Sequence, residues 1–280
     1  MGDKGLVVRM MAEADLEVAL DWAAAEGWNP GLHDAHCFYA ADPDGFLLGE
    51  LDGVPVGSVS AVRYGSGFGF LGLYIVRPER RGQGFGLALW RAALERLGDR
   101  VAGLDGVVAQ QENYRKSGFR LAFRTIRQRG EGGGEAPAGL TGLSAVPAHE
   151  IARYDRGAFP APRDAFLKSW TSQPQAVALG ARDGTGLKGY GVLRACRDGF
   201  KIGPLFADDE RTAERLLAGL MAGAPGAPVF LDTPEANPAA VALAARFRMT
   251  PVFETARMYR NGAPEIRLER CFGLTTFELG

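Results

Sequence analysis

The chain has 280 residues, of which 46% are hydrophobic and 23% are charged, and its formal net charge is -1. This length suits one large domain or two of ordinary size, and the apolar fraction is sufficient for a buried core. A net charge near zero gives no electrostatic reason to expect a nucleic acid or an anionic membrane as a partner. The sequence predicts no segment that crosses a membrane, because no apolar run is long enough.

The cysteines Cys37, Cys196 and Cys271 are widely spaced, and the sequence has no CxxC pair. An odd and scattered set predicts free thiols, so we expect neither a disulfide framework nor a metal site. Free thiols fit a reducing compartment, and the N-terminal residues MGDKGLVVRM lack the apolar region of a signal peptide. We therefore expect a cytoplasmic protein.

In chain order, the first half of the sequence predicts an α+β unit. The apolar run FGFLGLYIV predicts a buried central strand, and the helix after it should end at Gly98. Asp52-Gly53 is typical of a hairpin turn. The expected elements are a short strand from Val7, a helix over 14–26, hairpin strands over 46–51 and 54–63, a strand over 68–76, a helix up to 97, a strand over 101–108, a short helix before Gly118 and a strand over 119–129.

Residues 129–139, RGEGGGEAPAG, are rich in glycine, alanine and proline and predict a linker. The same order of elements returns after it, with Leu231-Asp232 in the place of Leu104-Asp105 and Arg248-Met249 in the place of Gly118-Phe119. Such an internal repeat indicates duplication of one α+β unit. The predicted division is therefore a first domain (1–129), a linker (130–139) and a second domain (140–280).

The stretch RPERRGQGFG, residues 77–86, lies between the predicted central strand and the helix. A glycine-rich turn that opens a helix directs backbone N–H groups and the positive helix end toward one point, which favours a phosphate or pyrophosphate. Arg80 and Arg81 add positive charge. The spacing is neither that of the nucleotide P-loop nor that of a Rossmann fingerprint, which also normally opens its domain.

This stretch resembles the acetyl-CoA motif [RQ]xxGx[GA] of the GNAT superfamily of acyltransferases, with Arg81, Gly84 and Gly86 in the key places. Asn113-Tyr-Arg-Lys-Ser-Gly-Phe119 resembles the YxxxGF helix end of the same family. The resemblance implies helix layers around a mixed, mostly antiparallel sheet. The whole chain is similar to a subgroup with a second, divergent GNAT-like half, on the basis of 27–31 (GWNPG), 203–207 (GPLFA) and 277–280 (FELG).

The resemblance also implies roles for individual residues. Tyr74, Ile75 and Val76 would offer backbone groups to pantetheine and the thioester, and the N–H of Val76 would polarise the acyl carbonyl. Tyr114 would protonate the leaving thiolate. The remaining residues expected to bind acetyl-CoA are Arg81, Gly82, Gln83, Gly84, Phe85, Gly86, Leu87 and Asn113.

The acceptor side is less specified by the sequence. Trp28, Asn29, His33 and Asp105 are candidate contacts for an amine acceptor. The general base remains open between an ordered water, Glu50, His33 and a carboxylate from the second half.

The second half should not bind CoA. Its counterpart of the glycine loop, FADDERTAERLL, is acidic and would repel a pyrophosphate, and Phe247 lies near the place of Tyr114.

The predicted function is acetyl transfer from acetyl-CoA to an amine of a small molecule or amino acid. The alternative is a CoA-binding sensor without turnover. The sequence does not specify the oligomeric state.

Overall fold

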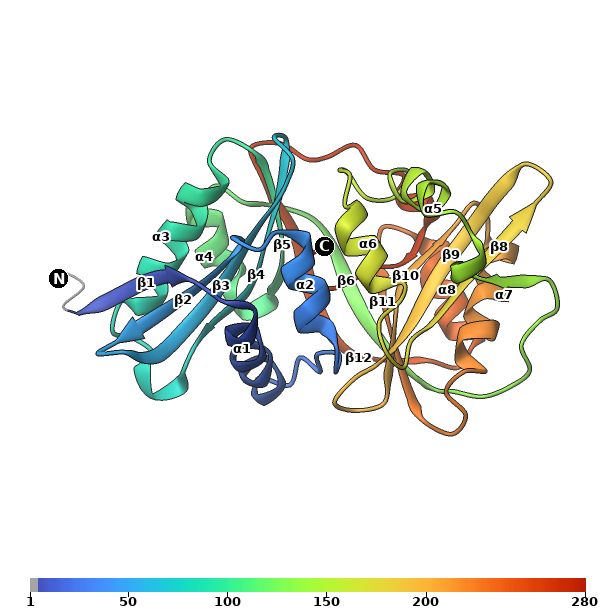
Figure 1. The fold of residues 1–280 in the computed structure, drawn as a ribbon, viewed down its shortest axis with the longest axis horizontal. Helices are drawn as coiled ribbons and strands as arrows, with labels where there is room; N and C mark the ends of the chain where they lie inside the picture. Colours follow the sequence, from blue (N-terminus) through green and yellow to red (C-terminus); the bar gives the residue numbers. More distant parts are fainter. Residues whose placement is uncertain (1–4) are drawn as a thin grey trace.

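The computed structural model describes residues 5–280. Within this range, one continuous sheet of 13 strands passes through both halves of the chain, which form two lobes side by side (Figure 1). The strand order is β1-β2-β3-β4-β5-β12-β6-β11-β10-β9-β8-β7, and β13 pairs with β10. The strands are β1 (Leu6–Met10), β2 (Phe46–Leu51), β3 (Val54–Tyr64), β4 (Phe68–Val76), β5 (Val101–Val107), β6 (Arg120–Glu131), β7 (Leu140–Gly142), β8 (Val177–Asp183), β9 (Gly186–Ala195), β10 (Phe200–Ala207), β11 (Pro228–Pro234), β12 (Thr250–Arg260) and β13 (Cys271–Gly273).

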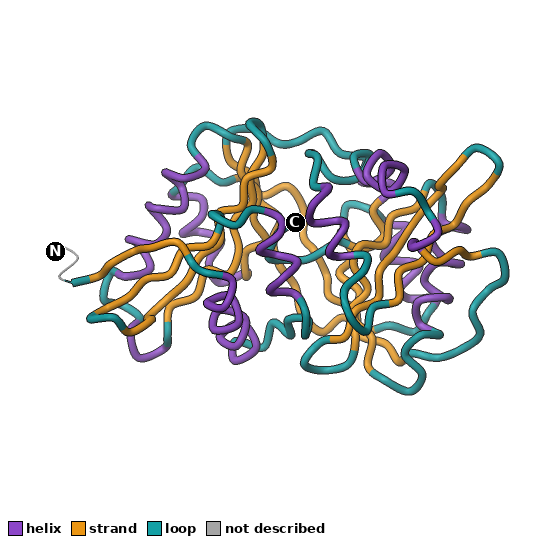
Figure 2. Tube along the Cα trace, viewed as in Figure 1, coloured by secondary structure: helices purple, strands orange, loops and turns teal. Residues whose placement is uncertain are grey.

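Helices cover both faces of this sheet (Figure 2). They are α1 (Glu13–Ala25), α2 (Asp34–Ala41), α3 (Phe85–Leu97), α4 (Gln111–Lys116), α5 (Ala148–Asp155), α6 (Asp164–Trp170), α7 (Glu210–Met221) and α8 (Pro238–Arg246). Helices α1, α2, α5 and α6 share one buried core, which joins the two lobes. The other face carries α3 and α4 in the first lobe and α7 and α8 in the second. The expected α+β class with helices on both sides is confirmed. None of the helices in residues 5–280 is both long and apolar enough to span a bilayer.

Local sequence explains the elements that shape the first lobe. The β2–β3 hairpin turns at Asp52 and Gly53, both with positive φ, as the Asp-Gly pair predicts. Strand β4 is buried on both faces, because Phe70 belongs to the core that joins the lobes while its neighbour Leu71 packs under α3. Helix α3 ends at Gly98, whose φ is 59°.

The closing strands of the two halves are exchanged, which the sequence pattern does not reveal. β12 lies between β5 and β6, and β6 continues the sheet of the second lobe by pairing with β11. Figure 1 shows these two strands crossing in the middle of the molecule. Thr255 stands opposite Thr125 at the centre of the antiparallel pair. β6 also extends to Glu131, so the first two residues of the predicted linker lie in the sheet.

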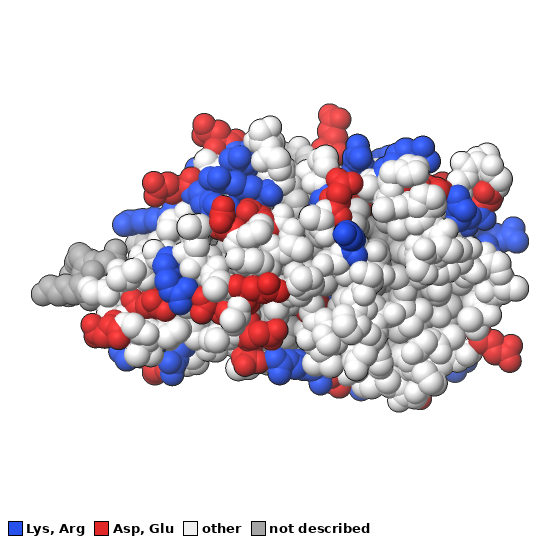
Figure 3. All heavy atoms as spheres, in the orientation of Figure 1, with Lys and Arg blue, Asp and Glu red and all other residues white. Residues whose placement is uncertain are grey.

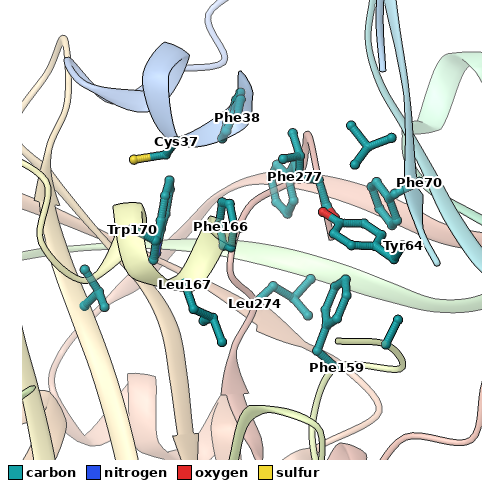
Figure 4. Close-up of a cluster of buried hydrophobic side chains, with 14 of the residues drawn as sticks. Cys37, Phe38, Tyr64, Phe70, Phe159, Phe166, Leu167, Trp170, Leu274 and Phe277 are labelled. Carbon is teal, nitrogen blue, oxygen red and sulfur yellow. The ribbon is translucent and has the colours of Figure 1, made fainter. Parts of the chain in front are cut away.

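An aromatic cluster fills the space between the lobes (Figure 4). Phe38 of α2 stacks on Trp170 of α6, with ring centroids 6.2 Å apart. Tyr64 of β3 meets Phe159 edge to face at 4.9 Å. All four side chains are buried, and a shared apolar core of this kind holds the two lobes in one arrangement.

Candidate active site

Strands β4 and β5 separate partway along their length. They pair in parallel only from Phe68 with Val101 to Leu71 with Leu104. Beyond this point, residues 72–76 and 105–107 diverge, and a bulge with Leu73 at φ 44° bends β4. Backbone groups on the inner edge of β4 are therefore left without a strand partner.

The direction of these backbone groups follows from the β3–β4 ladder. Arg77 donates its N–H to the carbonyl of Val56 at 3.0 Å. Because N–H groups alternate in direction along an antiparallel strand, the N–H of Val76 points away from β3 and into the opening.

The glycine loop follows β4 directly and leads into α3. Gly82 and Gly84 have φ of 74° and 92°, which glycine adopts without strain, and open space surrounds both. Gly84 is the N-cap residue of α3, and no side chain caps this helix end. A Cβ on Gly86 would come within 2.7 Å of the Tyr74 hydroxyl. The loop is thus a bare, concave backbone surface at the positive end of a helix, which fits a pyrophosphate.

A cavity of about 480 Å³ connects the loop to the interior. It begins at the exposed residues Arg81 and Leu87, follows β4 from Leu71 to Val76, and ends between the lobes. Residues of both halves line the inner end: Trp28, Asp105, Phe253, Thr255, Phe277 and Glu278.

Two phenols lie along this cavity. Tyr114 is buried, its ring lies 5.3 Å from that of Trp90, and a Cβ at Gly106 would collide with it. Burial raises the pKa of the Tyr114 phenol, and the neighbouring Tyr74 contributes. Burial also raises the pKa of Tyr74. Both phenols therefore stay protonated at neutral pH and are able to donate a proton.

Arginines hold two of the three carboxylates that line the cavity. Asp105 forms a bidentate pair with Arg257, with N···O distances of 2.9 and 2.7 Å. Burial raises the pKa of Asp105 in spite of this pair, helped by the nearby anions Asp232 and Glu278. Glu26 pairs with Arg81, which also donates to the Val76 carbonyl at 2.9 Å. The third carboxylate is that of Glu278.

Comparisons with known proteins agree with this geometry. Residues 14–119 match the model of the acetyltransferase (GNAT) family, and residues 151–273 match that of an acetyltransferase (GNAT) domain. A holothin acyltransferase of Pseudoalteromonas sp. (strain SANK 73390) is 33% identical over 267 residues, which cover 94% of this chain and 91% of the relative.

The chain belongs to the GNAT family of acyltransferases. It has two GNAT domains in tandem.

Solved structures share this tandem GNAT fold. A putative acetyltransferase from Pyrococcus horikoshii has a TM-score of 0.86 at 24% identity, covering 100% of this chain and 98% of that one. A tandem GNAT protein from the clavulanic acid biosynthesis pathway has a TM-score of 0.62 at 17% identity, covering 93% and 100%. At these identities the likeness concerns the fold.

The second GNAT domain has the same strand separation, but its own chain fills it. β10 and β11 pair in parallel only over Phe200–Ile202 and Val229–Leu231, and β13 then pairs with β10 where the opening would be. Next, Leu274 donates its N–H to the Asp232 carbonyl at 2.9 Å. The groove that remains open in the first domain is therefore occupied in the second.

The N-terminus of the helix that follows, α7, is also unavailable to an anion. Asp209 caps α7 by accepting the N–H of Thr212 at 2.8 Å. The acidic loop thus satisfies a helix N–H group itself.

The counterpart of Tyr114 in the second domain is Ala244 rather than the predicted Phe247. Met249 donates its N–H to Ala244 in the same way as Phe119 donates to Tyr114. In either case the second domain lacks a phenol at this point.

The structure brings most of the predicted site residues to one cavity. The predicted residues that line it are Trp28, Tyr74, Ile75, Val76, Arg81, Gly82, Gly84, Gly86, Leu87, Asp105 and Tyr114.

Five predicted residues lie outside the lining. Gln83 and Asn113 are exposed, and Phe85 is buried in the first turn of α3. Asn29 exchanges two hydrogen bonds of 2.8 Å with the backbone of Asp198 and so connects the lobes. His33 has a buried Nε2 without a partner in the described residues, but it does not line the cavity.

Sequence reasoning allowed for a carboxylate from the second half but did not identify which residues of that half reach the inner end. Phe253 and Thr255 come from the exchanged strand β12, and Phe277 and Glu278 come from the segment after β13. The hydroxyl of Thr255 is buried and has no hydrogen-bond partner within residues 5–280. The one available signal was Glu278 itself, a carboxylate within the apolar sequence FELG.

Proposed function

We propose that this chain transfers an acyl group, with acetyl as the first candidate, from acyl-CoA to the amine of a small acceptor. The two substrates would meet in a ternary complex. The observation that carries the proposal is the single cavity that joins the bare glycine loop, the unpaired edge of β4, Tyr114 and a polar inner end. This arrangement offers separate parts of one cavity to the CoA portion, the reacting thioester and the acceptor.

The first domain would hold the CoA portion. The loop from Gly82 to Leu87 would take the pyrophosphate, because its backbone is bare and faces a helix N-terminus. The edge of β4 would hydrogen-bond the pantetheine arm within the strand separation. Arg81, fixed by the Val76 carbonyl and Glu26, would give positive charge at the entrance.

The chemistry would take place where β4 leaves β5. The N–H of Val76, directed into the opening, would stabilise negative charge on the carbonyl oxygen, and such a donor contributes about 2.7–4 kcal/mol. Tyr114 would donate its phenolic proton to the leaving sulfur. Its raised pKa keeps that proton available at neutral pH.

The acceptor would enter the inner end of the cavity. Trp28, Phe253 and Phe277 offer aromatic surface there, and the Thr255 hydroxyl offers an unsatisfied polar group. The relative from Pseudoalteromonas is named as a holothin acyltransferase, which supports acyl transfer as the reaction.

Calorimetry with acetyl-CoA, using ATP and NAD as controls, tests the cofactor part. We expect one site per chain for acetyl-CoA and none for the controls. Gly84→Asp should abolish binding, because it places a carboxylate at the pyrophosphate position. Gly226→Asp is the matched control, since Gly226 also has positive φ and open surroundings but lies in the second domain.

Turnover is tested by release of free CoA thiol with a panel of amines. Amine-dependent release would support the transferase. Binding of acetyl-CoA without release in the whole panel would favour a CoA-binding sensor.

A further inference from the structure

Glu278 reaches the inner end of the cavity on a segment that is fixed at several points. The Thr276 hydroxyl accepts the N–H groups of Glu278 and Leu279 at 3.1 and 2.9 Å. The Leu279 carbonyl accepts from the Tyr64 hydroxyl at 3.0 Å. The Glu278 carbonyl packs against Gly72, where any Cβ would collide with it. The segment therefore sits on β4 at the point where β4 and β5 separate.

The side chain of Glu278 differs from the other carboxylates of the cavity. Glu26 and Asp105 are paired with arginines, whereas Glu278 has no hydrogen bond or ion pair to its carboxylate within residues 5–280. The residue is only 3% exposed and lines the cavity. Its oxygens are not among the buried atoms without a partner, so they are open to the cavity and free to bond to a group that enters it.

Four charged groups from four strands interact electrostatically with this carboxylate. Arg127 of β6, Arg194 of β9 and Lys201 of β10 are close enough to interact with it electrostatically, as is Asp105 of β5, which is held by Arg257 of β12.

The three cations that interact electrostatically with Glu278 already have other partners. Arg127 pairs with Asp232, Arg194 pairs with Asp34, and Lys201 donates to the Trp28 carbonyl at 3.0 Å. None of them forms a hydrogen bond or an ion pair with the Glu278 carboxylate.

We propose that Glu278 is the general base of the acyl transfer and the binding site for the ammonium group of the acceptor. The inference rests on the proposed function. It also narrows the acceptor to a compact amine that is cationic in solution and has an aromatic or other planar apolar body, which Trp28, Phe253 and Phe277 would contact.

The step balances as follows. The bound ammonium gives one proton to Glu278 and becomes a neutral amine. Its nitrogen forms a bond to the acyl carbon, and the carbon–sulfur bond breaks. Tyr114 protonates the sulfur, and the second proton lost by the nitrogen restores the phenol. Glu278 then releases its proton to water, so the products are the amide, CoA thiol and one proton.

Glu278→Gln tests the inference, because it keeps the size and the backbone contacts of the residue but cannot take the proton. We expect kcat/KM for the amine to fall about 100-fold at pH 7. The loss should shrink as the pH rises and the amine deprotonates in solution, whereas the affinity for acetyl-CoA should not change. Glu254→Gln is the control: Glu254 is on β12 beside Thr255 but pairs with Arg124 outside the cavity, and this variant should behave as wild type.

A wild-type rate in Glu278→Gln would overturn the inference, and so would an equal loss at every pH. Glu278→Asp provides a second test if the glutamine variant does not fold. Because it keeps a carboxylate base, its kcat/KM should fall at acid pH as in the wild type, but from a lower maximum. Failure of the wild-type protein to bind acetyl-CoA or acylate any amine would instead reject the proposed function.

Discussion

The two GNAT domains of this chain differ in what lies where their central parallel strands separate. In the first domain, β4 and β5 separate around a cavity, and α3 begins at an uncapped glycine. In the second domain, β13 fills the separation and Asp209 caps α7. Backbone groups at such places need partners from some source. The second domain supplies them from its own chain, and the first leaves them open toward the cavity.

The two domains also differ in the charges that surround a buried aspartate. Asp105 and Asp232 occupy matching places and each pairs with an arginine on an exchanged strand. Asp105 has anions nearby, and its pKa is raised by burial. Asp232 has Lys201 and Arg194 nearby in addition to Arg127, and its pKa is lowered. On the face drawn in Figure 3, acidic and basic side chains are interspersed over the first lobe, and much of the second lobe carries no charge.

The largest expected effect comes from breaking these buried pairs. Asp232→Asn and Asp105→Asn each leave a buried arginine without its counter-charge, so each should lower the free energy of unfolding by about 3–5 kcal/mol at pH 7. Urea unfolding measures this loss. Wild-type stability in either variant would contradict the assignment of the pairs.

The pH dependence of the same two variants should differ. The lowered pKa of Asp232 means that the unfolded chain binds this proton more readily, so its contribution to stability is lost as the pH falls below the ordinary aspartate range. Asp105, with a raised pKa, contributes stability at low pH that is lost as the pH rises. In Asp232→Asn, the free energy of unfolding should therefore fall less steeply as the pH is lowered than it does in the wild type. Asp105→Asn should not reduce this slope.

A second prediction separates the two phenols of the open domain. Tyr114→Phe should lower kcat about 100-fold, equivalent to about 2.7 kcal/mol, because the sulfur loses its proton donor. Tyr74→Phe should change kcat by less than about threefold if Tyr74 contributes only its backbone. Acetyl-CoA affinity, measured by calorimetry, should stay constant in both. The reverse order of effects would assign the proton donor to Tyr74.

The smallest expected effect is in the closed domain. Asp209→Ala removes the cap of α7 and should lower the free energy of unfolding by about 1 kcal/mol. Calorimetry should still find one acetyl-CoA site per chain, because β13 continues to fill the second opening. A second site in this variant would show that the acidic cap, rather than β13, closes that domain.

Much of the first domain could be predicted from the sequence because its signals are local. The Asp52-Gly53 turn, the apolar run of β4 and the glycine loop each specify nearby backbone geometry. The strand exchange could not be predicted, since 123–127 (FRTIR) and 253–257 (FETAR) carry the same alternation and suit the same neighbours. Pairing partners depend on contacts far apart in the chain.

The inner end of the cavity was the least predictable part for the same reason. Glu278 follows β5 by more than a hundred residues, and nothing around it in the sequence connects it to Asp105. Its burial is decided by the tertiary path of the segment after β13.

The strand exchange also determines when the site can form during synthesis of the chain. A ribosome makes the glycine loop and Tyr114 early, yet β12, which pairs with β5, and Glu278 come more than a hundred residues later. A nascent chain that has reached Glu131 therefore has the loop but lacks one wall of the cavity. The site can be completed only when nearly all of the second domain has been synthesised, so that the first domain cannot mature ahead of its partner.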